Sequence, residues 1–177
     1  MKKLLLGVLC FVCILPAFGQ EFDTRVPIKN RGASTYYVDG HIEGFGRASL
    51  LVDTGSGYAT INEETLAVLK AKGQTRFVKE LRGVMADGSQ KIVPVYRIGS
   101  INLGGNCVIN DVEVAVFPSK TRLILGLSAL RKVSPFIFSM EEPPSLLLSN
   151  CQPTSTALLA DPDLSTRALT AMSDTPL

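Results

Sequence analysis

The sequence predicts an all-β domain, a small barrel or sandwich that carries one or two short helices. Short apolar stretches separated by Gly or Asp-Gly recur from Val26 to Leu148, and helical amphipathic periodicity is almost absent over the same span. The chain has 177 residues, of which 46% are hydrophobic and 19% are charged. It can therefore bury one core, but it would be cramped as two domains.

Three pairs of strands are predicted, each joined at a turn that contains glycine. They are residues 35–42 with 47–52, the two arms of 84–95 around Asp87-Gly88, and 97–103 with 107–117 around Gly104-Gly105. Glycine permits the positive φ that tight hairpin turns require, and Asp-Gly between apolar residues is a strong hairpin signal. The arm at 107–117 alternates well, through Val112, Val114 and Val116.

One helix has both start and stop signals. Asn62 is suited to its N-cap, Glu63 and Glu64 lie in its first turn, and Gly73 follows its last turn. A second, shorter helix is predicted at 127–132. Strands at 136–138 and 146–148, on either side of a Glu-Glu-Pro-Pro turn, complete the predicted elements.

The first nineteen residues are interpreted as a secretory signal peptide. Lys2 and Lys3 precede an apolar run at 4–15, and Ala17-Phe18-Gly19 places small residues where a signal peptidase cleaves. The run is shorter than the roughly 20 residues that span a bilayer, so no stable membrane span is expected once the leader is removed. We expect an exported protein, anchored to the membrane only if the leader is retained.

The mature part is predicted to consist of a domain at 20–151 and a flexible tail at 152–177, rich in Thr, Ser, Ala, Asp and Pro. A processed or docking extension is the alternative interpretation of the tail. Cys107 and Cys151 would remain after removal of the leader. They could form a disulfide in an oxidising compartment, but the sequence alone leaves the pairing open.

Composition argues against several classes of function. Without Lys2 and Lys3 the chain has 16 basic and 16 acidic residues, so the clustered basic surface that binds nucleic acid is not expected. The single His cannot supply a multi-His zinc site, and no CxxC motif occurs in the mature part. We expect no metal and no cofactor.

The segment Leu50-Leu51-Val52-Asp53-Thr54-Gly55-Ser56-Gly57 carries the main functional signal. An apolar strand, expected to be buried on both faces, runs directly into a carboxylate, and burying an unpaired carboxylate is costly. The glycines that follow allow a sharp turn and a close approach by another backbone. Asp53 is therefore expected to have a partner, although a lone Asp-Thr-Gly can also be an ordinary Asx turn.

Two further features follow this segment in the chain. A hairpin tipped by Ala86-Asp87-Gly88-Ser89 comes next, and then the apolar stretch Leu123-Ile124-Leu125-Gly126, which enters a short helix. In this order the three features resemble the retropepsin-like aspartic proteases of clan AA. The resemblance covers about 36–148 and is closest to the exported, single-lobe bacterial type, which implies an expected location in the periplasm.

The resemblance implies a closed retropepsin-type barrel that is active as a symmetric homodimer and hydrolyses extended peptide. Asp53 of each subunit would form a proton-sharing catalytic pair, supported by Thr54, Gly55 and Ser56, with Ser56 able to donate a hydrogen bond to the pair. The hairpin at 84–95 would be the flap over the substrate. The expected flap and substrate-binding residues are Val84, Met85, Ala86, Asp87, Gly88 and Ser89, and the closing strand is Leu123, Ile124, Leu125 and Gly126.

Other residues are given structural roles. Asp87-Gly88-Ser89 is interpreted as a turn and not as a second catalytic loop, His41 as a surface residue, and 76–82 as a solvated charged face. The alternative to an aspartic endopeptidase is a non-catalytic member of the same fold that binds peptide or dimerises in the cell envelope. A purely structural envelope protein is a third hypothesis.

Overall fold

The computed structural model describes residues 22–84 and 87–153. The predicted leader, most of the predicted tail, and Met85 and Ala86 of the flap lie outside the described residues. Within them, no helix is long and apolar enough to cross a membrane.

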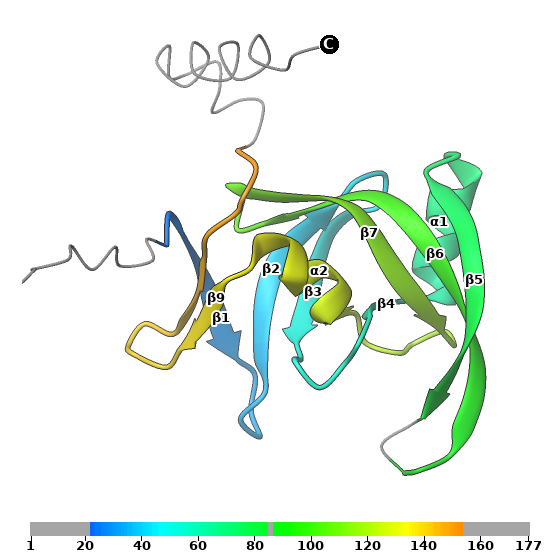
Figure 1. The fold of residues 1–177 in the computed structure, drawn as a ribbon, viewed down its shortest axis with the longest axis horizontal. Helices are drawn as coiled ribbons and strands as arrows, with labels where there is room; N and C mark the ends of the chain where they lie inside the picture. The colour runs from blue at the N-terminus through cyan, green and yellow to red at the C-terminus, as the bar shows by residue number, and fades with distance from the viewer. Residues whose placement is uncertain (1–21, 85–86, 154–177) are drawn as a thin grey trace, which may run out of the picture.

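Six strands close a barrel, which confirms the predicted fold class (Figure 1). In the order in which they pair around the ring, they are β2 (Tyr36–Ile42), β3 (Gly46–Val52), β8 (Ile124–Leu125), β4 (Ala59–Asn62), β7 (Cys107–Phe117) and β6 (Gln90–Leu103). The ring closes because β6 also pairs with β2, at Gly40↔Leu103 through Ile42↔Ile101. Every barrel strand thus has a neighbour on both sides.

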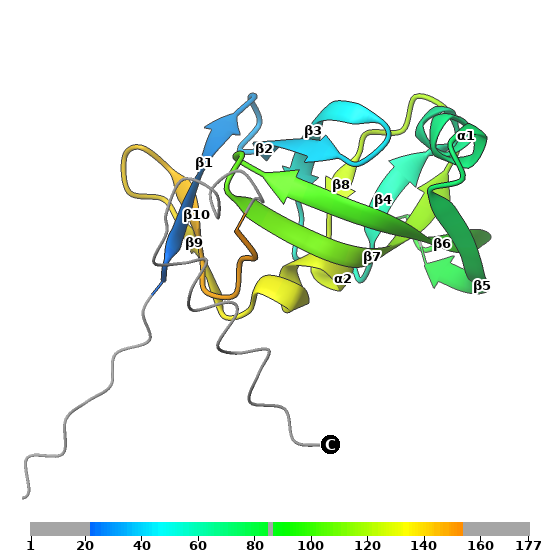
Figure 2. The same cartoon turned by 90° about the horizontal axis from the view of Figure 1, so that it is seen from above.

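Four further strands extend the barrel at opposite ends (Figure 2). At one end β5 (Thr75–Val84) pairs antiparallel with β6 and forms the predicted flap hairpin. At the other end β1 (Thr24–Asn30) pairs with β2 and with β10 (Ser145–Leu148), which pairs with β9 (Phe136–Ser139).

The predicted helices are present and short. The helix α1 (Glu63–Ala71) begins where the Asn62 side chain accepts a hydrogen bond from the Thr65 amide, 2.9 Å away, as an N-cap does. The second predicted helix forms as α2 (Leu127–Leu130), followed by the 3-10 turn η1 (Arg131–Val133).

The core fills the barrel. Ile42, Leu50, Ile98, Val114 and Leu125 come from five different strands, and each is at most 2% exposed. A disulfide joins Cys107, at the start of β7, to Cys151 after β10. Gln152 then pairs with Val108 of β7, so the chain remains attached to the barrel at the first residue of the segment predicted as a tail.

Two of the predicted segments have a different form in the structure. The outgoing arm of the flap and the first arm of the next predicted hairpin are one strand of 14 residues, β6, because no residue between Val95 and Arg97 favours a turn. Residues 76–82, interpreted as a solvated charged face, belong to β5, whose charged side chains lie on the exposed positions of a strand.

Candidate active site

Asp53 follows the last residue of β3, and the closing strand β8 holds it there. β8 runs parallel to β3, with Leu51 opposite Ile124 and Val52 opposite Leu125. The Leu51 amide donates to the Leu123 carbonyl at 2.9 Å, and the Asp53 amide donates to the Leu125 carbonyl at 3.2 Å. The two segments that the sequence singled out about seventy residues apart therefore meet at the Asp53 backbone.

The loop Asp53–Gly57 is folded by hydrogen bonds of its own. The Gly55 amide donates to Asp53 Oδ1 at 2.9 Å, and the Ser56 amide donates to the Asp53 carbonyl at 3.3 Å. The Ser56 hydroxyl donates to the Tyr58 carbonyl at 2.7 Å. In the protomer this hydroxyl closes the loop, and its donation to a carboxylate pair stays a prediction.

Gly126 packs directly against the far side of this loop. A Cβ atom at Gly126 would lie 2.1 Å from the Tyr58 carbonyl oxygen and 2.9 Å from the Ala59 nitrogen, which no side chain tolerates. The Leu127 amide also donates to the Ser56 carbonyl at 2.9 Å. The glycine of the Ile-Leu-Gly segment is thus required by a close backbone approach.

Ser128 is a supporting residue that the sequence did not single out. Its hydroxyl accepts a hydrogen bond from the Ala59 amide at 2.8 Å and donates to the Glu113 carbonyl at 2.7 Å. It therefore links the exit of the loop to β7. The one feature of the sequence that could have predicted this role is the position of Ser128, two residues after Gly126.

The end of β3 is less buried than the sequence predicted. Leu50 is buried, but Leu51, Val52 and Asp53 are half-buried, and Thr54 and Gly55 are exposed. The expectation of a strand buried on both faces is wrong for the protomer, because β3 ends at the rim of the barrel. The Asp53 loop therefore presents an open surface.

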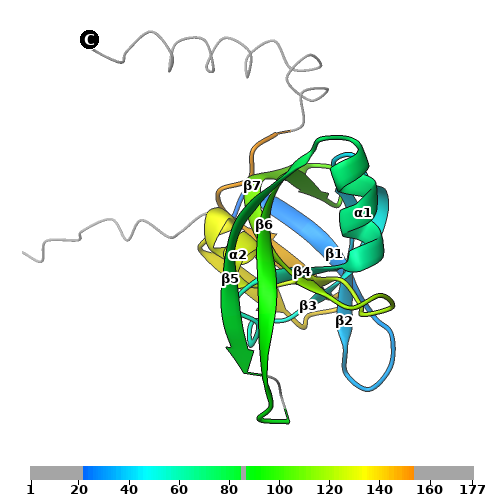
Figure 3. The same ribbon diagram turned by 90° about the vertical axis from the view of Figure 1, so that its right-hand side faces the viewer.

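The flap hairpin projects beyond the barrel, on the side where β3 also ends (Figures 1 and 3). At its tip, Asp87 Oδ1 accepts hydrogen bonds from the Ser89 hydroxyl at 2.7 Å and the Ser89 amide at 2.9 Å, and Gly88 has a φ of +79°. These two bonds, the hydroxyl's first, hold the pKa of the Asp87 carboxyl below its usual range. Val84, on the incoming arm, is 68% exposed.

A contact between the flap arm and the Asp53 loop was not predicted. Lys79 Nζ, on β5, lies 5.6 Å from the centre of the Tyr58 ring, and Tyr58 follows Gly57 in the loop. The interaction with the Tyr58 side chain raises the pKa of Lys79. Lys79 therefore links the flap arm directly to the end of the Asp53 loop, two regions that are otherwise connected only through the barrel.

A separate cavity lies away from the Asp53 loop. It has a volume of about 750 Å³ and is lined by residues of β1, β2, β3, the end of β6 and the β6–β7 turn, with none from the Asp53 loop or the flap tip. Since chemistry at Asp53 needs reacting groups close to its carboxylate, we place the candidate active site at the loop and not in this cavity. Within the described residues, no group of three or more His, Cys, Asp or Glu side chains could hold a metal ion.

A one-lobe barrel, an Asp-Thr-Gly loop held by a closing strand, and a flap hairpin together define the class of retropepsin-like aspartic proteases. Residues 38–132 match the model of the family described as gag-polyprotein putative aspartyl protease, a match that includes all three features. The chain belongs to this family. No curated protein matches the sequence.

Two solved structures are similar to this chain to different degrees. A retropepsin-like aspartic protease from Rickettsia conorii is 14% identical, with a TM-score of 0.50 over 71% of this chain and 89% of that chain. The retroviral protease-like domain of Ddi1 from Leishmania major is 18% identical, with a TM-score of 0.44 over 66% of this chain and 95% of that chain. The likeness to the protein from Rickettsia conorii, at 14% identity, concerns the fold alone.

Proposed function

We propose that the protein is an aspartic endopeptidase that hydrolyses peptide bonds in extended polypeptides. The observation that carries the proposal is the position of Asp53, in a loop fixed by β8 and Gly126 and open at the surface. The family supports peptide hydrolysis as the activity. We also propose that the protein is exported to the periplasm, and this rests on the leader sequence.

The chemistry requires two carboxylates, and the chain has one Asp-Thr-Gly triplet. The second is therefore proposed to be the partner subunit's Asp53 in a symmetric homodimer. Two carboxyl groups a few Å apart do not both ionise, so they share one proton. The ionised one takes a proton from water, which attacks the peptide carbonyl, and the protonated one polarises that carbonyl and supplies the proton that the leaving nitrogen needs.

The exposure of Thr54 and Gly55 supports this arrangement, since both are available to meet a second copy of the loop. The flap is proposed to close over an extended peptide, with Val84 to Ser89 contacting the substrate and the strand around Leu123 lining its pockets. Such a cover excludes water and adds main-chain hydrogen bonds to the bound strand.

The test is cleavage of a denatured protein substrate by the purified full chain, with and without a pepstatin-type inhibitor. Asp53→Asn should lower kcat about 10²-fold to 10⁴-fold, the usual contribution of a positioned acid or base. Asp111→Asn is the matched control, because Asp111 is exposed at a φ of +53° that Asn also adopts. Specific activity should also fall on dilution as subunits separate.

The rival hypothesis gives a different result. A protein that dimerises and binds peptide, yet leaves it intact from acid to neutral pH, would be the non-catalytic module. A structural envelope protein would bind no peptide, and Asp53→Asn would then change stability at most.

A further inference from the structure

The 750 Å³ cavity is a groove on the outer face of the sheet, formed where β2 changes partner. One edge of β2 pairs with β1 up to Val38 and with β6 from Gly40 onward. Beyond that point β1 diverges from the barrel, while the β6–β7 turn stays attached because the Gly104 amide donates to the Asp39 carbonyl at 3.1 Å. The groove lies between β1 and this turn.

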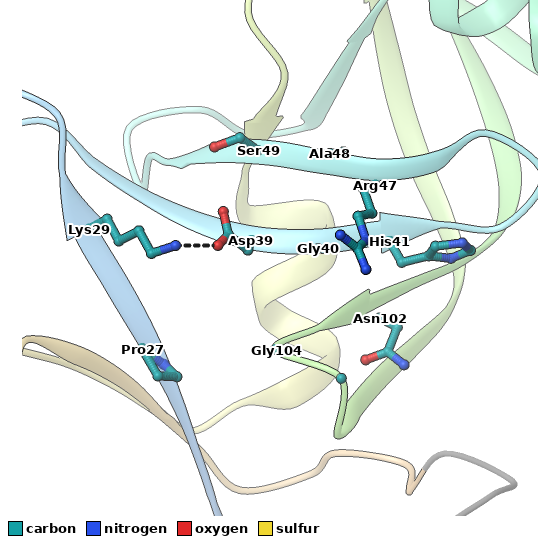
Figure 4. A pocket seen from close by; sticks show the side chains of 11 residues that line it. Pro27, Lys29, Asp39, Gly40, His41, Arg47, Ala48, Ser49, Asn102 and Gly104 are labelled. Atoms are coloured by element: carbon teal, nitrogen blue, oxygen red, sulfur yellow. Dashed lines mark hydrogen bonds and ion pairs between the residues drawn. The ribbon is translucent and has the colours of Figure 1, made fainter.

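Basic and amide side chains gather on one side of the groove. His41 lies directly across from Arg47 on β3 and from Asn102 on β6, so the three side chains share the outer face of three adjacent strands. In Figure 4 the side chains of Arg47, His41 and Asn102 lie near one another, and the Arg47 guanidinium points toward the strand that carries Asn102. Among them, His41 and Arg47 offer N–H donors to an anionic ligand.

The charge of the groove is not balanced. Lys29 and Asp39 form an ion pair of 2.6 Å and neutralise each other. The only other ion pair among the described residues joins Arg97 to Glu113, so Arg47 has no carboxylate partner there. An acidic ligand would supply the missing charge.

The described part of the chain ends close to this groove. The disulfide from Cys151 to Cys107 and the hydrogen bond from the Val108 amide to the Gln152 carbonyl, 2.9 Å long, hold residues 151–152 against β7. The pairing of Gln152 with Val108 is antiparallel. At Pro153, where the described residues end, the chain is therefore directed past Cys107 toward Gly104 and Gly105, which line the groove.

We propose that the groove binds the segment 154–177 of the same chain through its carboxylates. This segment contains Asp161, Asp163 and Asp174 against the single cation Arg167. Its 24 residues reach about 80 Å when extended, which is ample for the groove. Because one end is attached beside the rim, the effective concentration is of millimolar order, so weak ion pairs suffice. The proposal does not depend on catalysis.

Carbodiimide cross-linking of the full chain tests the proposal. The reagent activates a carboxylate, and a lysine amine then attacks the activated carbonyl and releases the reagent as a urea. The amide that forms is identified by mass spectrometry. The Lys29–Asp39 amide is an internal reference, since the ion pair is present in the structure. We expect Lys29 also to link to Asp161, Asp163 or Asp174. Using Asp53→Asn protein keeps the segment intact if the proposed protease is active, and makes the result independent of that activity.

Arg47→Ala should lower the yield of links between Lys29 and the acidic segment about twofold to fivefold relative to the reference, as expected for the loss of one partly exposed ion pair. Arg76→Ala, an exposed arginine on β5, is the matched control and should change nothing. The proposal is overturned if the segment links no more to Lys29 than to Lys72, Lys91 or Lys120, or if Arg47→Ala has no effect. In a mixture of ¹⁴N-labelled and ¹⁵N-labelled protein, links between differently labelled copies would overturn binding within one chain.

Discussion

The Asp53 loop and the tip of the flap have similar local turns but different attachments to the rest of the molecule. In each, an Asp Oδ1 accepts a hydrogen bond from the amide two residues later, from Gly55 in one case and from Ser89 in the other, at 2.9 Å in both. Both are Asx turns that the amino-acid types predict. The local hydrogen bonding therefore does not distinguish a catalytic loop from a hairpin tip.

The difference lies in what holds each turn from outside. The backbone of the Asp53 loop is bonded to Leu125 and Leu127, and Gly126 lies against it. At the described residues of the flap tip, no hydrogen bond to another part of the molecule is found, and Asp87 is exposed. Catalysis needs a carboxylate in a fixed position, whereas a cover for the substrate must open. The tertiary attachments, and not the turns, match the two roles proposed for these regions.

The largest expected effect is on the attachment of the Asp53 loop. Gly126→Ala should lower the free energy of unfolding by about 2 to 4 kcal/mol, because the added methyl group overlaps the Tyr58 backbone and the loop must move. Urea denaturation at a fixed protein concentration measures this. Gly57→Ala, in the same loop but with no atom within 4 Å of the added Cβ, should stay within about 0.5 kcal/mol of the parent. Equal losses in the two variants would contradict the close approach.

Much of the fold follows from local signals in the sequence. The strands of the first hairpin, the helix capped by Asn62 and the Asp87-Gly88 turn depend on alternation, capping and turn residues that lie close together in the chain. The pairing of Asp53 with the Ile124-Leu125-Gly126 segment came from a family resemblance, since no local rule joins segments so far apart.

What the sequence did not predict depends on distant neighbours. The four residues of β4 form a strand only because they pair with β7 and with β8. β1 contains Pro27, which argues against a strand, yet Pro27 lies where β1 changes partner from β10 to β2. The hydrogen bond of the Ser56 hydroxyl and the contact of Lys79 with Tyr58 likewise need the folded chain.

A smaller effect is expected where the two regions touch. Lys79→Met keeps the length of the side chain but removes the ammonium group beside Tyr58, and should lower kcat/KM about twofold to fivefold by loosening the flap arm from the loop. Lys79→Arg should retain most of the parent value.

The pH dependence of this contact has a defined sign. The folded-state pKa of Lys79 is raised above the ordinary 10.5, so its contribution to stability is complete below 10.5 and is lost as the pH rises through the folded value. The difference in stability between parent and Lys79→Met should therefore vanish only in strong alkali. If this difference in stability instead disappears between pH 7 and pH 9, the titration of another group is responsible for it.

The smallest effect is expected at the flap tip. Because the Ser89 hydroxyl and amide hold the pKa of Asp87 below 3.8, the turn is stabilised by the charged carboxylate above that pH, and this contribution is lost as the pH falls through the folded value. Ser89→Ala removes the hydroxyl and should move the titration midpoint of the Asp87 carboxyl upward, as measured by NMR, while Ser89→Thr should leave it in place. Since the tip has no attachment beyond its own residues at the positions described, neither substitution should change global unfolding. A Ser89→Ala protein that unfolds more readily as a whole would show that the flap tip is held by the barrel as firmly as the Asp53 loop.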